Sequence, residues 1–221
     1  MLRRTAAFQA AIQFFPGQEQ SIMKLRYSPT SPFVRKVAAL AIETGLHSKI
    51  ERQKTTTADP DLLDDNPLGK VPALVTDDGI KMYDSPVICE YLDSLHSGRK
   101  MFPAAGKDRW AALRHQALGD GLMEAGLLAF VELRKPAEKQ MADFITKQLG
   151  KAERACKVLE NEIAVLEGPV TIGHLAVACG INYADRRIPE FGWRKTCPKL
   201  AKWYETFCQR PSMKDTAAPE S

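Results

Sequence analysis

The sequence predicts a protein of two parts, a small α/β domain followed by an all-helical domain. Strand and helix patterns follow one another over residues 23–98 in the order βαβ–ββα. A stretch with two glycines and Pro103 then interrupts the periodicity, and helical patterns continue almost to the end of the chain. With 221 residues, the chain is long enough for two domains of about 100 residues, each with its own core.

The α/β domain begins with alternating residues before Pro29, and its first helical pattern stops at Gly45. Asn66–Gly69 marks a turn, and Asp77-Asp78-Gly79 is typical of a hairpin. The predicted elements are, in order, a strand over 23–28, a helix over 33–41, and strands over 47–54, 71–75 and 80–82, followed by a helix over 86–95.

The helical domain is predicted to open with a long helix from Lys107 to Arg134. Pro136 is expected to start a second helix, whose buried stripe runs from Met141 to Leu166. Helices over 172–186 and 198–209 follow. We therefore divide the chain into an extension (1–22), an α/β domain (23–98), a linker (99–106), a helical domain (107–214) and a tail (215–221).

The first 22 residues carry Arg3 and Arg4 before an alanine-rich run, a pattern weakly similar to a targeting segment. They lack a long apolar core, and the strand pattern opens only at Met23. We interpret them as an upstream extension outside the fold.

Composition excludes several classes of function. The formal charge of +4 comes from scattered lysines and arginines, which does not indicate a nucleic-acid surface. No apolar run approaches the roughly 18 residues of a membrane span. The five cysteines form no CxxC pair and no Cys/His cluster with metal spacing, so we expect reduced thiols, no metal and a cytoplasmic location.

Two helix starts share one design. Ser31-Pro32 opens the first predicted helix and Ser85-Pro86 the helix over 86–95. Serine suits the N-cap and proline the first turn, so each start alone is ordinary helix capping. Free amides and the positive end of the helix dipole also attract anions, so a pair of such starts could hold a ligand with two negative groups.

Three motifs in order resemble signatures of the glutathione S-transferase family. They are Ser31-Pro32-Phe33-Val34-Arg35-Lys36, Asn66-Pro67-Leu68-Gly69-Lys70-Val71-Pro72-Ala73-Leu74 and Asp84-Ser85-Pro86-Val87-Ile88-Cys89-Glu90-Tyr91-Leu92. The similarity extends over about residues 23–218. It implies a thioredoxin-like α/β domain, glutathione as co-substrate, a homodimer and a small hydrophobic electrophile as second substrate.

The resemblance also implies roles for individual residues. Ser31 matches the catalytic serine of serine-type members, with Thr30 and Ser28 as alternatives for the hydroxyl that faces the sulfur. Glutathione-binding residues would be Lys70, Val71, Pro72, Asp84 and Ser85, with Pro72 in the cis form. Asp84 departs from the usual glutamate and is shorter by one methylene.

A hydroxyl aimed at the sulfur is energetically sufficient for catalysis. A free thiol has a pKa of about 8.5, so only a few per cent is thiolate at neutral pH. A charge-assisted hydrogen bond contributes roughly 1.5–3 kcal/mol, and about 1.4 kcal/mol moves a pKa by one unit. One such bond could bring the thiol pKa to about 7.

The electrophile would lie between the domains, where Phe33, Leu113 and Met123 are candidate wall residues, although plain packing is the simpler interpretation of each. Trp110, Trp193 and Trp203 are expected in the core. The family's Ser/Thr-x-x-Asp box, which caps a buried helix, is replaced here by Thr171-Ile172-Gly173-His174. We predict a weaker start for that helix, with His174 as a capping or core residue.

The sequence therefore predicts glutathione transfer: attack of a stabilised thiolate on an electrophilic carbon, as in detoxification. Two alternatives stay open. One is a glutathione-dependent disulfide or peroxide reductase. The other is a non-catalytic, transferase-like protein that binds other proteins.

Overall fold

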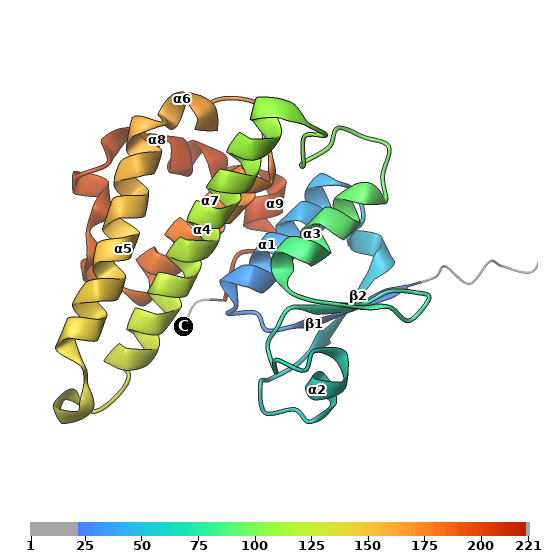
Figure 1. The fold of residues 1–221 in the computed structure, drawn as a ribbon, viewed down its shortest axis with the longest axis horizontal. Coiled ribbons are helices and arrows are strands. Elements are labelled where there is room, and N and C mark those ends of the chain that lie inside the picture. The colour runs from blue at the N-terminus through green and yellow to red at the C-terminus, as the bar shows by residue number, and fades with distance from the viewer. Residues whose placement is uncertain (1–21, 220–221) are drawn as a thin grey trace, which may run out of the picture.

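The computed structural model describes residues 22–219 and begins with a four-stranded mixed sheet. The strands are β1 (Met23–Tyr27), β2 (Ile50–Lys54), β3 (Ala73–Val75) and β4 (Lys81–Met82), in the spatial order β2-β1-β3-β4. β1 pairs in parallel with β2, and β3 is antiparallel to both β1 and β4. Helices α1 (Pro32–Glu43) and α3 (Ser85–Ser94) cover one face, and the short α2 (Asp61–Asp65) lies on the other side (Figure 1). The predicted thioredoxin-like domain is confirmed.

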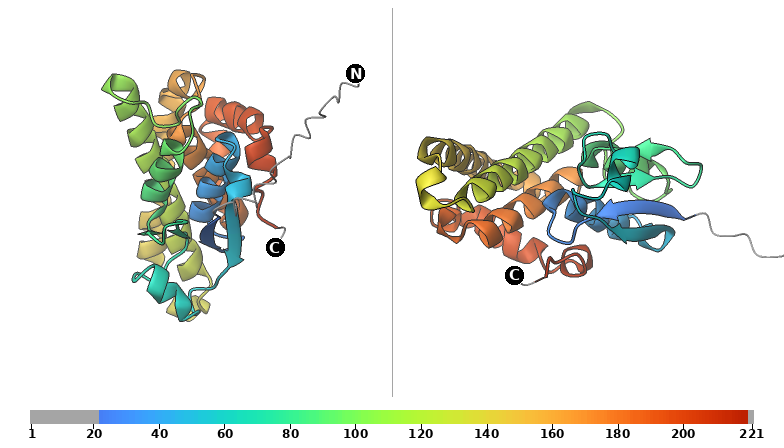
Figure 2. Two further views of the ribbon diagram at one scale, coloured as in Figure 1. Left: turned by 90° about the vertical axis from the view of Figure 1, so that its right-hand side faces the viewer. Right: turned by 90° about the horizontal axis from the view of Figure 1, so that it is seen from below.

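The second half is helical, as predicted. Its elements are α4 (Gly106–Leu133), α5 (Ala142–Asn161), α6 (Ile163–Leu166), α7 (Ile172–Arg187), α8 (Pro198–Phe207) and α9 (Pro211–Lys214), with 3₁₀ turns at Ala137–Lys139, Pro189–Phe191 and Trp193–Lys195. α7 is the central helix, because twelve of its sixteen residues are buried. Figure 1 and Figure 2 show α4 and α5 side by side on one flank of it, and α8 and α9 on the other.

Two sequence expectations about this half are wrong. The helix predicted from Pro136 begins only at Ala142, after a 3₁₀ turn, and a break at Glu162 separates α5 from α6. Met141 is 61% exposed and does not start a buried stripe. Trp193 and Trp203 are buried as expected, but Trp110 is 69% exposed near the start of α4.

Glycines allow α4 and α7 to cross at close range. A Cβ on Gly119 would lie 2.4 Å from the backbone carbon of Ala176, and one on Gly180 would lie 2.8 Å from the carbonyl oxygen of Gly119. A Cβ on Gly173 would meet the Cβ of His115 at 2.7 Å. Gly173 is therefore required by packing, although glycine weakens a helix start when considered alone.

The two halves meet along α1, which contacts α3 in its own domain and α7 and α9 in the helical domain. Glu43 at the end of α1 accepts hydrogen bonds from Arg210 and Ser212. Lys36 in the middle of α1 reaches Asp120 on α4. Within residues 22–219, no helix has the length and apolar character of a membrane span.

Candidate functional site

Ser31 caps the first helix, as predicted. Its backbone is extended, and its Oγ accepts a hydrogen bond of 3.3 Å from the amide of Val34. Pro32 follows at the first helical position. Because capping uses only a lone pair of the oxygen, the hydroxyl proton of Ser31 can be donated to another group. The side chain is half-buried, so a ligand at the start of α1 could reach it.

The two alternative hydroxyls lie in the preceding loop. Thr30 is exposed and its Oγ1 lies 3.3 Å from the Oγ of Ser28, so these two hydroxyls hydrogen-bond to each other. Ser28 also accepts the amide hydrogen of Ser31 on its carbonyl oxygen, which closes the turn before the helix. All three hydroxyls therefore belong to one turn, and Ser31 is the one held by the helix itself.

The second motif forms a braced turn. Asn66 is 1% exposed, donates from Nδ2 to the carbonyl of Lys70 at 2.7 Å and accepts from the amide of Leu68 at 3.0 Å. Gly69 has a φ of +61°, which favours glycine. The Val71–Pro72 bond is cis, as the resemblance implies. The turn leaves Lys70 exposed and Val71 half-buried at the entrance to β3.

The third motif differs in part from the expectation. Asp84, rather than Ser85, is the N-cap of α3, and Ser85 is the first helical residue, 1% exposed. The carbonyl of Asp84 accepts from the amide of Ile88, while its carboxylate caps no amide among the described residues. Asp84 is exposed, so its carboxylate is accessible beside the start of the helix. The Tyr83–Asp84 bond is also cis.

A buried ion pair lies behind this helix start. The side chain of Lys36 is 0% exposed, and its Nζ donates to both carboxylate oxygens of Asp120, at 2.6 and 2.8 Å. Burial raises the pKa of Asp120, Lys36 lowers it, and the nearby charge of Asp84 raises it further. Asp120 is thus close enough to Asp84 to interact with it electrostatically.

The three candidate wall residues are not equivalent. Phe33 on α1 and Leu113 on α4 are half-buried and pack against the main core. Met123 is 0% exposed, so it offers no surface to a ligand. For Met123 the simpler interpretation, plain packing, agrees with the structure.

Cysteine chemistry is disfavoured at this site. Burial raises the pKa of Cys89 on α3 and of Cys156 to about 12, and that of Cys179 to about 11. Such thiols stay protonated at neutral pH and do not act as nucleophiles. Among the described residues, no group of His, Cys, Asp and Glu is arranged to hold a metal ion.

Sequence reasoning missed two parts of the site. Asn66 belongs to the recognised motif, but its bracing role follows only from its burial and its bond to Lys70. The pairing of Lys36 with Asp120 spans 84 residues. A lysine within the apolar pattern of the first helix was the available signal, since a buried lysine requires an acidic partner.

Comparisons with known proteins agree with these features. A family model of the glutathione S-transferase N-terminal domain matches residues 30–95, and one of the C-terminal domain of the same family matches residues 118–211. The chain is 35% identical over 202 residues to YibF, an uncharacterized GST-like protein of Escherichia coli (strain K12), with 90% of this chain and 100% of YibF covered.

Solved structures are also similar. A glutathione transferase family member from Pseudomonas fluorescens Pf-5, crystallised with glutathione, is 42% identical, with a TM-score of 0.87 over 89% of this chain and 99% of that one. A glutathione S-transferase from Methylobacillus flagellatus KT, with glutathione bound, is 35% identical, with a TM-score of 0.82 over 89% of this chain and all of that one.

Proposed function

This chain belongs to the glutathione S-transferase family, and we propose that it binds glutathione and transfers it to a small electrophile. The observation that carries the proposal is the pair of helix starts, with Ser31 capping α1 and the accessible carboxylate of Asp84 beside α3. The two glutathione-bound structures above, 35% and 42% identical to this chain, support it.

In the proposed complex, the two helix starts hold opposite parts of the tripeptide. The amides at the start of α3, where Ser85 is the buried first residue, face the γ-glutamyl carboxylate, and Asp84 pairs with the α-ammonium group. Val71, before cis-Pro72, offers its backbone to the cysteinyl part, and Lys70 flanks the same turn. Ser31 donates its hydroxyl proton to the sulfur and so favours the thiolate.

The chemical step forms one bond and breaks one. The glutathione thiol loses its proton to solvent, and the sulfur electron pair forms a bond to the electrophilic carbon as the leaving group departs with its own pair. Holding both reactants in place adds to the rate. Phe33 and Leu113 are the remaining candidates for the wall of the electrophile site.

The role of Ser31 is tested with 1-chloro-2,4-dinitrobenzene as electrophile. We expect Ser31→Ala to lower kcat/KM about tenfold at neutral pH and to move the midpoint of its pH profile from about 7 to about 8.5, because the thiol returns to its ordinary pKa. The Kd for glutathione should change little, since Ser31 contacts only the sulfur.

Thr30→Val is the matched control, because valine keeps the shape of threonine without its hydroxyl. Equal activity of Ser31→Ala and wild type would remove Ser31 from this role while leaving glutathione binding intact. A shift of the pH profile in Thr30→Val alone would assign the hydroxyl to Thr30.

The alternatives made from the sequence stay predictions. A reductase would use the same thiolate to attack sulfur or oxygen, and turnover of a small disulfide or peroxide would reveal it. A non-catalytic relative should not be retained on immobilised glutathione. The homodimer and the cytoplasmic location are likewise proposals from family membership, supported for the location by five free cysteines.

A further inference from the structure

Three buried or half-buried arginines have no carboxylate partner among the described residues. Six of the arginines in residues 22–219 are buried or half-buried, and Arg26, Arg109 and Arg210 among them pair with a carboxylate. The other three, Arg35, Arg186 and Arg187, form no ion pair with a described residue. Buried charges are normally paired, so guanidinium groups that are buried or half-buried, with no carboxylate partner among residues 22–219, require an explanation.

The contacts of these arginines are to neutral groups. Arg35 on α1 is 8% exposed and donates to the carbonyl of Met213 at 2.9 Å and to the hydroxyl of Thr216 at 3.4 Å, while its Nη1 is buried without a partner. Arg186 on α7 donates to the carbonyl of Pro219 at 3.4 Å. The guanidinium of Arg187 lies 4.6 Å from the ring centre of Phe130, and its Nε is buried without a partner.

Arg186 is close enough to the other two arginines to be repelled by them. The pKa of Arg186 is lowered by burial, and also by the neighbouring positive charges of Arg187 and Arg35. An anion placed among them would relieve this repulsion and complete the hydrogen bonding of the guanidinium groups.

Arg35 of this cluster lies one helical turn from Ser31, where the sulfur is proposed to bind. Ser31 and Arg35 are four residues apart, so they share one side of α1, and helical side chains lean toward the N-terminus, here toward Ser31. α1 contacts α7, which carries Arg186 and Arg187. The right-hand view of Figure 2 shows blue α1 and orange α7 adjoining at the border of the two domains.

We propose that Arg35, Arg186 and Arg187 attract and hold a carboxylate of the second substrate, so that this enzyme acts on electrophiles that carry a carboxylate group. The half-buried Arg186 and Arg187 make the contacts, and Arg35 behind them adds its charge. This inference rests on the proposed transfer function and specifies its substrate class.

A matched pair of probes separates charge from reactivity. 4-Chloro-3,5-dinitrobenzoate carries the carboxylate, and 4-chloro-3,5-dinitrobenzamide replaces it with a neutral group. In both reactions a carbon–sulfur bond forms, the carbon–chlorine bond breaks and chloride leaves with the bonding pair, while the thiol proton passes to solvent. Each enzymatic rate is divided by the uncatalysed rate with glutathione.

We expect wild type to prefer the benzoate. Arg186→Gln and Arg187→Gln should each lower kcat/KM for the benzoate about tenfold or more, because each removes a charge-assisted hydrogen bond to the carboxylate. Each should change kcat/KM for the benzamide less than about twofold. The preference should also fall as salt is added, because these charges are partly exposed to solvent. Arg186→Lys, which keeps the charge, should retain a preference for the benzoate.

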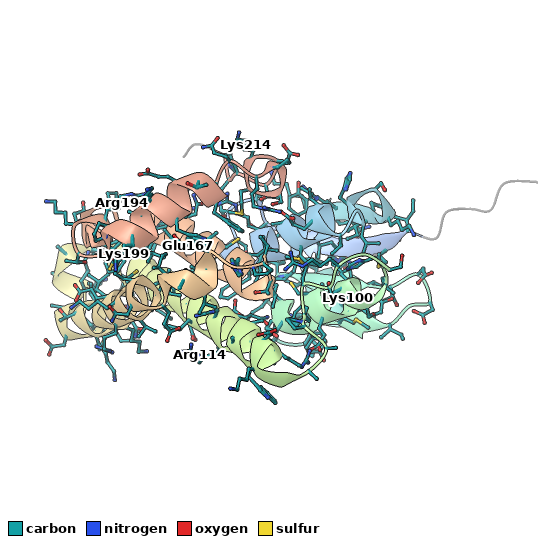
Figure 3. All side chains as sticks on the ribbon, turned by 90° about the horizontal axis from the view of Figure 1, so that it is seen from above. Lys100, Arg114, Glu167, Arg194, Lys199 and Lys214 are labelled. Atoms are coloured by element: carbon teal, nitrogen blue, oxygen red, sulfur yellow. The ribbon has the colours of Figure 1, made fainter. Side chains whose placement is uncertain are left out.

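Arg194→Gln is the control, because it removes the same charge from a paired arginine. Arg194 forms two hydrogen bonds of 2.7 Å with Asp185, and Figure 3 shows it at the outer end of the helical domain. Its selectivity should equal that of wild type. An equal loss in this variant, or equal normalised rates of wild type with both probes, would overturn the inference.

Binding of the two glutathione conjugates provides a readout that does not need turnover. Wild type should bind the carboxylated conjugate more tightly than the amide conjugate, and Arg186→Gln should remove that difference. Tight and selective binding without turnover would contradict the proposed transferase but support the arginine site. Turnover of both probes without selectivity would contradict only the arginine site.

Discussion

At the scale of single residues, the ion pair between Lys36 and Asp120 is expected to be the costliest polar contact to break. Lys36 is fully buried, so Asp120→Asn would leave an uncompensated charge in the core. Removing one partner of a buried pair costs about 3–5 kcal/mol, and we expect a loss at the lower end because Asp120 is 21% exposed. Urea unfolding of the variant measures this loss.

The exposed pair of Arg109 and Glu90 is the control, since it also joins α4 to the α/β domain, here to α3 instead of α1, but leaves Glu90 53% exposed. Arg109→Gln should cost less than about 1 kcal/mol. The double variant Lys36→Met/Asp120→Leu should recover most of the stability, because apolar groups replace both charges. A similar loss in Arg109→Gln and Asp120→Asn would contradict this account.

Single residues were predictable where local chemistry defines them. Ser31 was visible as a cap because serine before proline has a known preference, and the bond to Val34 confirms it. Lys36, Asp120 and the arginine cluster were not visible, because each depends on residues far apart in the chain. Whether such a charged residue needs a partner depends on how deeply it is buried, and its burial depends on how the whole chain packs.

At the scale of elements, the start of α7 is built differently from the sequence expectation. The missing carboxylate of the capping box is replaced by His174, whose Nδ1 accepts from the amide of Thr171 at 3.1 Å. The reciprocal bond of the box is therefore made without a carboxylate, and the weaker start of this helix stays a prediction. The capping role foreseen for His174 is confirmed.

This cap makes stability depend on pH. Burial is the main cause that lowers the pKa of His174 from its ordinary value of 6.5 to about 4. Because the unfolded state takes up the proton first, stability is complete above about pH 6.5 and falls as pH drops toward 4, by up to about 3 kcal/mol. Comparing urea unfolding at pH 7 and pH 4.5 measures it.

His174→Gln is the matched variant, since glutamine at this position can accept from the cap amide without titrating. It should lose less stability than wild type over the same pH range, and other acid effects cancel in the comparison. An identical pH dependence in both proteins would show that His174 does not titrate in the folded state as described.

Element types were predicted better than element ends. The spacing of apolar residues and the turn residues predicted the order of strands and helices, and α4 was predicted to within one residue at each end. The start of α5 was missed because Pro136 opens a 3₁₀ turn, which has the same sequence preference as a helix start. Met141 fits an apolar stripe and Trp110 was expected in the core, but both are exposed, since the sequence pattern does not say which face of a helix has a partner.

At the scale of the whole molecule, exposed apolar residues around Trp110 indicate where the expected homodimer forms its interface. Val87 on α3, Leu95 at its C-cap and Trp110 on α4 are 50%, 43% and 69% exposed, and the ion pair of Arg109 and Glu90 holds the two helices together. Large apolar groups exposed on two adjoining helices are typical of an interface. Family membership and this surface together predict a dimer that buries α3 and the first part of α4.

Sedimentation equilibrium should therefore give twice the chain mass of 24.6 kDa. Trp110→Asp should shift the equilibrium toward the monomer, because a charge buried at an interface is costly. Met141→Asp is the control: Met141 is similarly exposed, at 61%, but lies at the opposite end of the helical domain, beyond the last turn of α4. Dissociation by Met141→Asp rather than Trp110→Asp would move the interface to that end, and a wild-type mass of one chain would refute the dimer.

Because Trp110 is far along α4 from the arginines of α7, a monomeric Trp110→Asp that still prefers the carboxylated probe would also show that the substrate site is complete within one chain.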